Sequence, residues 1–157
     1  ITFDYYIVYK KYSIYFLIKK LKQFGDNFVI ANRVHYIKYK KNTIEKYNNW
    51  IWNSDKRKPS IFNFQTGVYG VLYPPKCFHK DVNKVDKFKK LSPYADDVWL
   101  YWMIRLNKKK VIWSGFSNRN FSLINSETKN LHKLNVGLKQ NDNQISNMIK
   151  KYGFPLK

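Results

Sequence analysis

The stretch TGVYGVLYPP at Thr66–Pro75 contains two glycines three residues apart and ends in a diproline. Glycines between apolar residues mark positions that need a positive φ angle or a close approach of another group to the backbone, so we expect a structured loop at Gly67 and Gly70. Pro74 and Pro75 end any extended segment, because proline lacks a backbone donor and restricts the residue before it. A third glycine and a following helix are missing, which excludes a nucleotide-binding glycine motif.

A second stretch, ADDVW at Ala95–Trp99, holds two adjacent carboxylates in a chain with only 10 acidic residues. Asp96 and Asp97 stand at the start of a predicted helix, where acidic side chains cap the helix and face its positive end. The alternative is that one carboxylate projects into a cleft as a general base and deprotonates a hydroxyl group. Trp99 likewise has two interpretations, a ring that stacks on a sugar or a side chain of the core.

Periodicity on either side of these stretches predicts alternating helices and strands. Apolar residues at helical spacing from Ile14 to Phe24, followed by Gly25, predict an amphipathic helix that ends at the glycine. The polar segment Lys40–Pro59 predicts a long loop with at most a short strand. The predicted strands are Ile1–Tyr9, Asn27–Ala31, Val34–Tyr39 and Lys109–Trp113, and the predicted helices are Tyr12–Phe24, Asp86–Leu91, Ala95–Asn107, Lys129–Leu134 and Asp142–Tyr152. Without an internal repeat or a linker, we expect residues 1–157 to form one α/β unit.

The net charge of +20 on 157 residues narrows the classes of partner. A balance this basic is typical of proteins that bind nucleic acid, anionic membranes or phosphorylated ligands. The lysines are scattered, however, and they accompany Asn, Ile, Tyr and Phe, so an A/T-rich genome offers another explanation of the excess. No RNA-binding aromatic motif, zinc-finger spacing or basic zipper is present, so nucleic acid is disfavoured and peripheral contact with an anionic membrane is preferred.

The compartment follows from hydropathy and cysteine content. No apolar run reaches the roughly 20 residues that a membrane-spanning helix requires. Cys77 is the single cysteine, which excludes an internal disulfide, favours a reducing compartment and predicts a packed side chain. We therefore expect a cytoplasmic protein, soluble or peripheral at the inner face of the cell membrane. Because the chain begins at Ile1 within a predicted strand and no cleavage signature precedes it, we also expect a piece of a longer protein.

The order of the glycine–diproline loop and the Asp-Asp pair resembles that of bacterial GT-A-fold glycosyltransferases that build surface polysaccharides and lipopolysaccharide. The resemblance extends to Ala31–Ile37, which is similar to the family's strand after the central helix, and to Asn141–Gln144, which is similar to its late Asn-Asp motif. Almost the whole chain is covered. The resemblance implies an α/β fold with a mixed sheet flanked by helices. Residues 1–157 would form a single, incomplete GT-A-like domain that lacks the amino-terminal nucleotide-binding half.

The resemblance also implies a reaction and the residues that perform it. The hydroxyl of a saccharide or lipid-linked acceptor would attack the anomeric carbon of a nucleotide-sugar donor, with Asp97 as the base and Asp96 orienting or capping it. The residues that would contact the substrates are Gly67, Gly70, Tyr73, Trp99, Asn141 and Asp142.

In this family a divalent cation, Mn²⁺ or Mg²⁺, is held by an Asp-x-Asp type motif and neutralises the departing diphosphate. Asp4 occupies the first position of that motif here, but Tyr6 stands at the second, and a phenol is a poor replacement for a carboxylate. By resemblance, the late His132 is a further candidate ligand. His35 and His79 are interpreted as surface or hydrogen-bonded residues, because the spacing of the histidines makes no metal site.

Two other hypotheses remain open. The chain is a non-catalytic remnant of such an enzyme if the change of the second acidic residue to Tyr6 abolished cation binding. It is instead a basic module for anionic lipid or nucleic acid if the charge of +20 is its functional feature, and binding would then weaken steeply with salt.

Overall fold

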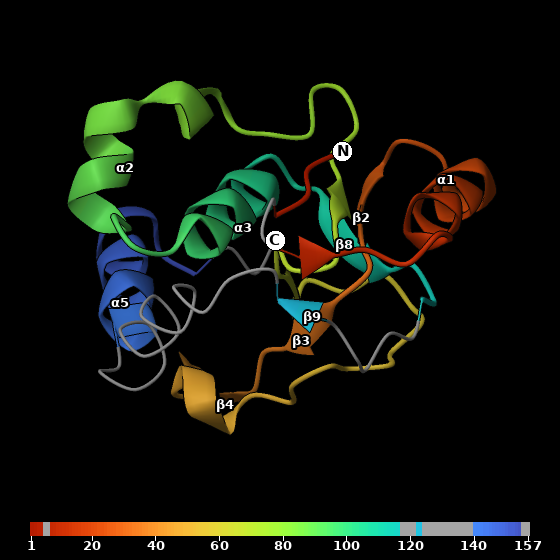
Figure 1. Cartoon of the computed structure of the whole chain (residues 1–157). Coiled ribbons are helices and arrows are strands. Elements are labelled where there is room, and N and C mark those ends of the chain that lie inside the picture. Colours follow the sequence, from red (N-terminus) through yellow and green to blue (C-terminus); the bar gives the residue numbers. More distant parts are fainter. Residues whose placement is uncertain (5–6, 117–121, 124–139, 155–157) are drawn as a thin grey trace.

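The computed structural model describes residues 1–4, 7–116, 122–123 and 140–154 (Figure 1). Its helices are α1 (Ser13–Phe24), α2 (Val85–Leu91), α3 (Asp96–Leu106) and α5 (Gln140–Tyr152), with the short 3₁₀ helices η1 (Tyr47–Asn49) and η2 (Lys80–Asn83). Its strands are β1 (Ile7–Val8), β2 (Phe28–Ala31), β3 (Val34–Tyr36), β4 (Tyr39–Lys40), β5 (Thr43–Ile44), β6 (Asn63–Gln65), β7 (Val71–Leu72), β8 (Lys110–Trp113) and β9 (Ser122–Leu123).

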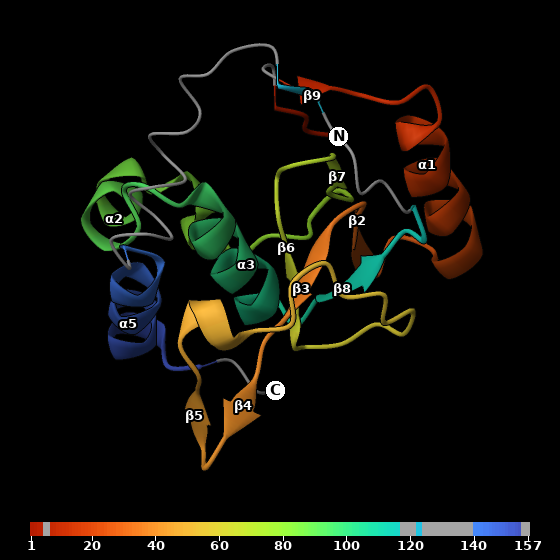
Figure 2. The same ribbon diagram turned by 60° about the horizontal axis from the view of Figure 1, so that its bottom comes forward.

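A three-stranded mixed sheet in the order β7-β2-β8 lies between two layers of helices. β2 runs parallel to β8, with Ile30 opposite Ile112, and antiparallel to β7. Successive side chains of a strand point to opposite faces, so Ile30 and Ile112 pack with Leu17 of α1, whereas Val29 packs with Ile104 of α3. Figures 1 and 2 show the result: α1 covers one side of the sheet, and α2, α3 and α5 lie on the other.

The second layer is built around α3. Tyr101, Trp102 and Met103 are fully buried, and Met148 of α5 belongs to the same core cluster. The indole N–H of Trp102 donates to the carbonyl oxygen of Gly153 at 2.9 Å, which ties the end of α5 to α3. Beside these helices, β3 pairs antiparallel with β6, and the β4–β5 hairpin projects away from the core (Figure 2).

The predicted α/β class is confirmed, because the described residues form a small mixed sheet with helices on both sides. The helices predicted over Tyr12–Phe24, Asp86–Leu91, Ala95–Asn107 and Asp142–Tyr152 are present with small shifts of their ends. Gly25 ends α1 as expected, with a φ of 71° and an N–H bond of 2.8 Å to the carbonyl oxygen of Leu21. The helix predicted over Lys129–Leu134 lies outside the described residues.

The strand predicted over Ile1–Tyr9 is wrong in its extent. Of its described residues, Ile7–Val8 forms a strand and Thr2 forms an isolated bridge to Val71. The Asp4 N–H donates to the Tyr9 hydroxyl at 2.7 Å, and the Tyr9 ring packs edge-on against Phe3, so residues at the two ends of this segment lie close together. The predicted loop Lys40–Pro59 contains β5 and η1.

Two expectations about burial and membranes can be checked in the described residues. Cys77 is buried as predicted, and burial raises the pKa of its thiol to about 11. None of the helices in this part of the chain has the length and apolar character needed to cross a bilayer.

Candidate functional site

The amino-terminal segment reaches the glycine loop through backbone pairing. The Thr2 N–H donates to the carbonyl oxygen of Val71 at 2.9 Å, and the Val71 N–H donates back to that of Thr2 at 3.1 Å. Phe3 then packs directly on Gly70, where a Cβ would lie 2.3 Å from the ring and where φ is +97°. Glycine is required there for both reasons. This docking brings Asp4 to the loop.

Asp97 approaches the same loop from the first turn of α3. The backbone N–H of Gly67 donates to Asp97 Oδ1 at 2.8 Å, and Gln65 Nε2 donates to the Asp97 carbonyl oxygen at 3.2 Å. Gln65 is fully buried at the end of β6, and its Oε1 has no hydrogen-bond partner within the described structure. A buried acceptor in this state is unusual and lies beside the candidate site.

Asp4 and Asp97 meet at Gly67. A Cβ at Gly67 would lie 3.4 Å from Asp4 Oδ1 and 3.4 Å from Asp97 Oδ1, so the two carboxylates are no further apart than twice that distance. The absence of a side chain at Gly67 keeps the space between them open. Asp96 is exposed beside this pair, and its Oδ1 accepts the N–H of Asp97 at 2.9 Å. Asp96 is therefore in a position to orient the first turn of α3.

Burial and the neighbouring carboxylates Asp96 and Asp4 raise the pKa of Asp97. Burial raises the pKa of the half-buried Asp97 carboxyl well above its usual value, and the charges of Asp96 and Asp4 raise it further. The Gly67 N–H bond and the charge of Arg33 lower it, but they do not outweigh burial. A carboxyl with a raised pKa in a cluster of like charges is more frequent at functional sites than elsewhere.

Tyr73 belongs to the same electrostatic environment. Burial raises the pKa of its phenol well above the usual value, and the charges of Asp97, Asp96 and Asp4 add to the effect. Its ring packs on Phe78, with the ring centroids 4.9 Å apart. The phenol therefore stays protonated at neutral pH and can serve as a hydrogen-bond donor.

Arg33 and Tyr47 are site residues that the sequence did not single out. Burial and then the charge of Asp97 raise the pKa of Tyr47, and Arg33 opposes this shift. Arg33 directly precedes β3, whose pairing with β6 brings the Arg33 carbonyl oxygen to the Thr66 N–H at 3.2 Å. The sequence does not reveal the pairing of β3 with β6, and this pairing is what places Arg33 beside the loop.

Trp99 is not brought to the carboxylates. It is 3% exposed, its indole N–H donates to the carbonyl oxygen of Val82 at 3.2 Å, and its ring contacts Phe88 and Tyr152. Residues two positions apart in a helix are separated by about 200° around its axis, so the Asp97 and Trp99 side chains point in nearly opposite directions. Of the two interpretations of Trp99, the structure supports the core residue.

Asn141 and Asp142 lie in the first turn of α5. Asn141 is buried, and Asp142 Oδ1 accepts the backbone N–H of Tyr47 at 2.7 Å, so this turn fixes η1 to α5. They are connected to the carboxylate pair only indirectly, through Tyr47. The predicted ligand His132 and the substituted position Tyr6 lie outside the described residues.

Of the divalent-cation site that the resemblance implies, the described residues contain only a part. Within them, no group of three or more His, Cys, Asp or Glu side chains is placed to hold a metal ion. Mg²⁺ and similar cations require a near-octahedral set of oxygen ligands, of which Asp4 and Asp97 would supply a part. His35 is the hydrogen-bonded residue that was predicted: it is buried, its Nδ1 accepts the Asn53 N–H at 3.2 Å, and burial lowers its pKa to about 3.

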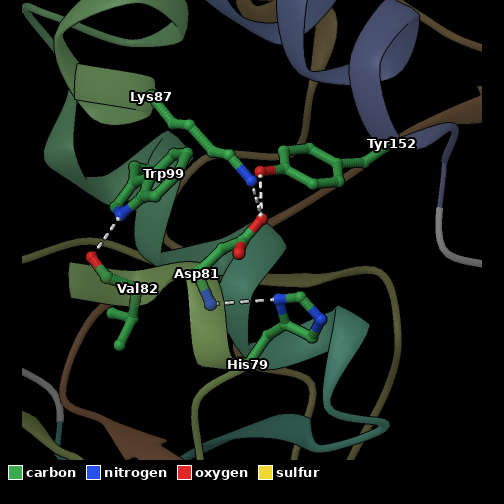
Figure 3. A network of polar contacts seen from close by, with 6 residues as sticks. All are labelled: His79, Asp81, Val82, Lys87, Trp99 and Tyr152. Carbon is green, nitrogen blue, oxygen red and sulfur yellow. Dashed lines mark hydrogen bonds and ion pairs between the residues drawn. The ribbon is translucent and has the colours of Figure 1, made fainter. Parts of the chain in front are cut away.

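A separate polar network lies behind α3 (Figure 3). Asp81 Oδ2 accepts bonds from Lys87 Nζ at 2.6 Å and from the Tyr152 hydroxyl at 2.9 Å, and His79 Nδ1 accepts the Asp81 N–H at 3.3 Å. The bond from Lys87 is the largest cause of a lowered pKa at Asp81. The network joins η2, α2 and α5 around Trp99, so its role is structural.

The candidate site thus consists of Asp4, Asp97, Asp96 and Tyr73 around Gly67, with Arg33 and Tyr47 beside Asp97. Comparison of the chain with protein-family models, with curated proteins and with solved structures finds no match. The assignment of a function therefore depends on the geometry of this site and on the motifs in the sequence.

Proposed function

We propose that the chain provides the acceptor side of a glycosyltransferase site, with Asp97 as the general base. One observation carries the proposal: Asp4 and Asp97, from distant parts of the chain, meet at Gly67, and the Asp97 carboxyl has a raised pKa. A carboxylate with a raised pKa is a stronger base, which suits removal of a proton from an acceptor hydroxyl.

The chemistry follows from the contacts of Asp97. The Gly67 N–H fixes Oδ1, so the carboxylate has a defined orientation toward the loop. The acceptor hydroxyl gives its proton to this carboxylate while its oxygen bonds to the anomeric carbon of the nucleotide sugar. The bond from that carbon to the diphosphate breaks, and the nucleoside diphosphate leaves with the electron pair. The protonated phenol of Tyr73 provides a hydrogen-bond donor for a sugar hydroxyl.

The proposal includes a finer fold and location. The small mixed sheet and a helix that begins with Asp96-Asp97 are compatible with an incomplete GT-A-like domain. Its acceptors would be saccharides or lipid-linked saccharides, which places the reaction in the cytoplasm at the inner face of the cell membrane.

A turnover assay tests the proposal. The protein, restored to full length with the nucleotide-binding half that the proposal requires, is incubated with a panel of nucleotide sugars, Mn²⁺ or Mg²⁺, and mixed saccharide and lipid-linked acceptors, and released nucleoside diphosphate is measured. Asp97→Asn retains an acceptor for the Gly67 N–H, and we expect it to lower release at least about 100-fold, as is usual for loss of a general base. Asp86→Asn, an exposed acid on α2, is the matched control. Full activity of Asp97→Asn would refute the assignment.

A non-catalytic relative is the second candidate. It is favoured by the lack of a third metal-ligating side chain near Asp4 and Asp97 among the described residues, together with Tyr6 in the sequence. Calorimetric titration with nucleotide sugars and Mn²⁺ separates the two candidates. Micromolar binding that Asp97→Asn weakens would count against the non-catalytic relative.

A further inference from the structure

The outward face of α1 carries a stripe of two tyrosines and two lysines. Tyr12, Tyr15, Lys19 and Lys22 follow one another at spacings of three, four and three residues, which places them on one side of a helix. Tyr12 is 58% exposed and Tyr15 is 55% exposed, and both lysines are exposed as well. The opposite side of α1 packs on the sheet through the fully buried Leu17.

A further apolar side chain widens the stripe. Ile14 lies next to the stripe on the helix and is 53% exposed, although periodicity predicted it on the buried side. The lysines interleave with the rings: Lys11 Nζ lies 5.8 Å from the Tyr12 ring centroid, and Lys19 Nζ lies 5.8 Å from that of Tyr15. Such an arrangement joins cationic and amphipathic groups on a single surface.

The charge of this segment has one sign. Residues 7–25 contain five lysines and no acidic residue. Arg57, from the loop before β6, lies close enough to the side chain of Lys20 to contribute to a lowered pKa there, although burial is the larger cause. Arg57 therefore adds positive charge near Lys20 of α1.

We propose that this face of α1 docks on an anionic lipid surface, with the tyrosines at the headgroup level and the lysines on lipid phosphates and carboxylates. Tyrosine is enriched at membrane–water interfaces because its ring is apolar and its hydroxyl is polar, and lysine extends its amine toward anionic headgroups. Exposed Ile14 gains from contact with the acyl boundary, whereas phosphates of a nucleic acid offer it no partner.

The same charges disfavour a second copy of the chain as the occupant. A symmetric dimer brings the same patch of both molecules together, so it would place the lysines of one stripe against those of the other. The proposal does not depend on the proposed function, since α1 and the carboxylate pair are separate features of the fold.

Vesicle co-sedimentation tests the docking surface. Each lysine near an anionic bilayer strengthens binding about fivefold. We therefore expect Lys19→Gln/Lys22→Gln to weaken binding about 30-fold on vesicles of phosphatidylcholine with about 30% phosphatidylserine. Lys89→Gln/Lys90→Gln removes the same charge from exposed positions of α2, on the far side of the molecule (Figures 1 and 2), and should weaken binding only slightly.

Replacing the tyrosines separates the contribution of the rings to vesicle binding from that of charge. Tyr12→Ala/Tyr15→Ala leaves the charge unchanged and should weaken vesicle binding at least about fivefold, because interfacial burial of the two rings is lost. Far-UV circular dichroism checks that each variant keeps its helices. Loss of binding in these variants with retention in the α2 control supports the docking surface.

Several results would overturn the proposal. Equal weakening by the α1 and α2 lysine pairs would show nonspecific attraction by net charge. No binding to the anionic vesicles, or equal binding to vesicles of pure phosphatidylcholine, would remove the anionic surface as the occupant. Tighter binding to a single-stranded oligonucleotide that needs the same stripe would assign the face to nucleic acid. A dimer at sedimentation equilibrium that Tyr12→Ala/Tyr15→Ala dissociates would assign it to a second copy.

Discussion

Gly70→Ala should detach the amino-terminal segment from the glycine loop. Two costs arise at this position. A non-glycine residue at a φ of +97° loses about 1–2 kcal/mol of stability. In addition, the new Cβ would lie 2.3 Å from the Phe3 ring, well inside the optimal carbon–carbon separation of about 3.5–4.0 Å, so the ring must leave its place. Loss of the half-buried Phe3 contacts adds about 1 kcal/mol, for a total of about 2–3 kcal/mol.

Urea denaturation with a double-mutant cycle separates the two costs. Gly115→Ala is the matched control, because Gly115 has a φ of +89° but no atom within 4 Å of a built Cβ, so it should lose only the backbone cost. Phe3→Ala alone should lose about 1 kcal/mol. Phe3→Ala/Gly70→Ala should be no less stable than Gly70→Ala, because the clash disappears with the ring.

The cycle can refute this account of the docking. Equal destabilisation by Gly70→Ala and Gly115→Ala would show that the Phe3 ring does not pack on Gly70. Strict additivity of Phe3→Ala and Gly70→Ala would lead to the same conclusion, since residues in contact are expected to couple.

Three further predictions follow from titration and burial. The folded-state pKa of Asp97 is raised, so wild type loses stability as pH rises from the unfolded pKa of about 3.9 through the folded pKa. The unfolding free energy of Asp97→Asn should therefore increase relative to that of wild type over this pH range. A difference that does not change with pH would contradict the raised pKa. The folded-state pKa of Asp81 is lowered, so its contribution to stability is present above the unfolded pKa and disappears as pH falls through the folded pKa. Asp81→Asn should be less stable than wild type at neutral pH, and this difference in stability should close in acid. An equally large difference in acid would argue against the network. Cys77 is buried and the pKa of its thiol is raised to about 11, so an aromatic disulfide reagent at neutral pH should modify it only as the protein unfolds in urea. Rapid modification in native buffer would show that the thiol is accessible.

Helices were predictable because their signals are local. Apolar side chains at helical spacing and the glycine at position 25 define α1, and the acidic first turn Asp96-Asp97 marks the start of α3. One position on α1 departs from the pattern. Ile14, in the first turn, has the spacing of a buried residue but is exposed.

The carboxylate pair was not predictable as a pair. Sequence reasoning selected Asp97 as a base and Asp4 as a metal ligand on separate grounds, without placing them together. Their meeting depends on the pairing of Thr2 with Val71 and on the packing of Phe3 on Gly70, both of which join residues far apart in the chain. No local pattern reports such contacts.

Trp99 shows a different limit. Its proximity to Asp97 in sequence suggested a shared site, but helical geometry turns the two side chains to opposite sides of α3. The indole then completes the core beside the Asp81 network (Figure 3), where its N–H bonds to the Val82 carbonyl oxygen. Helix phase, rather than residue type, decides between the two interpretations.

The central claim is that Asp4 and Asp97 form one electrostatic unit at Gly67. Carbon-13 carboxyl NMR measures it directly, by titrating Asp97 in wild type and in Asp4→Asn. We predict that Asp97 titrates well above the usual aspartate value of about 3.9 in wild type and that its pKa falls when Asp4 is replaced. Titration of Asp97 near about 3.9, with no response to Asp4→Asn, would contradict the claim.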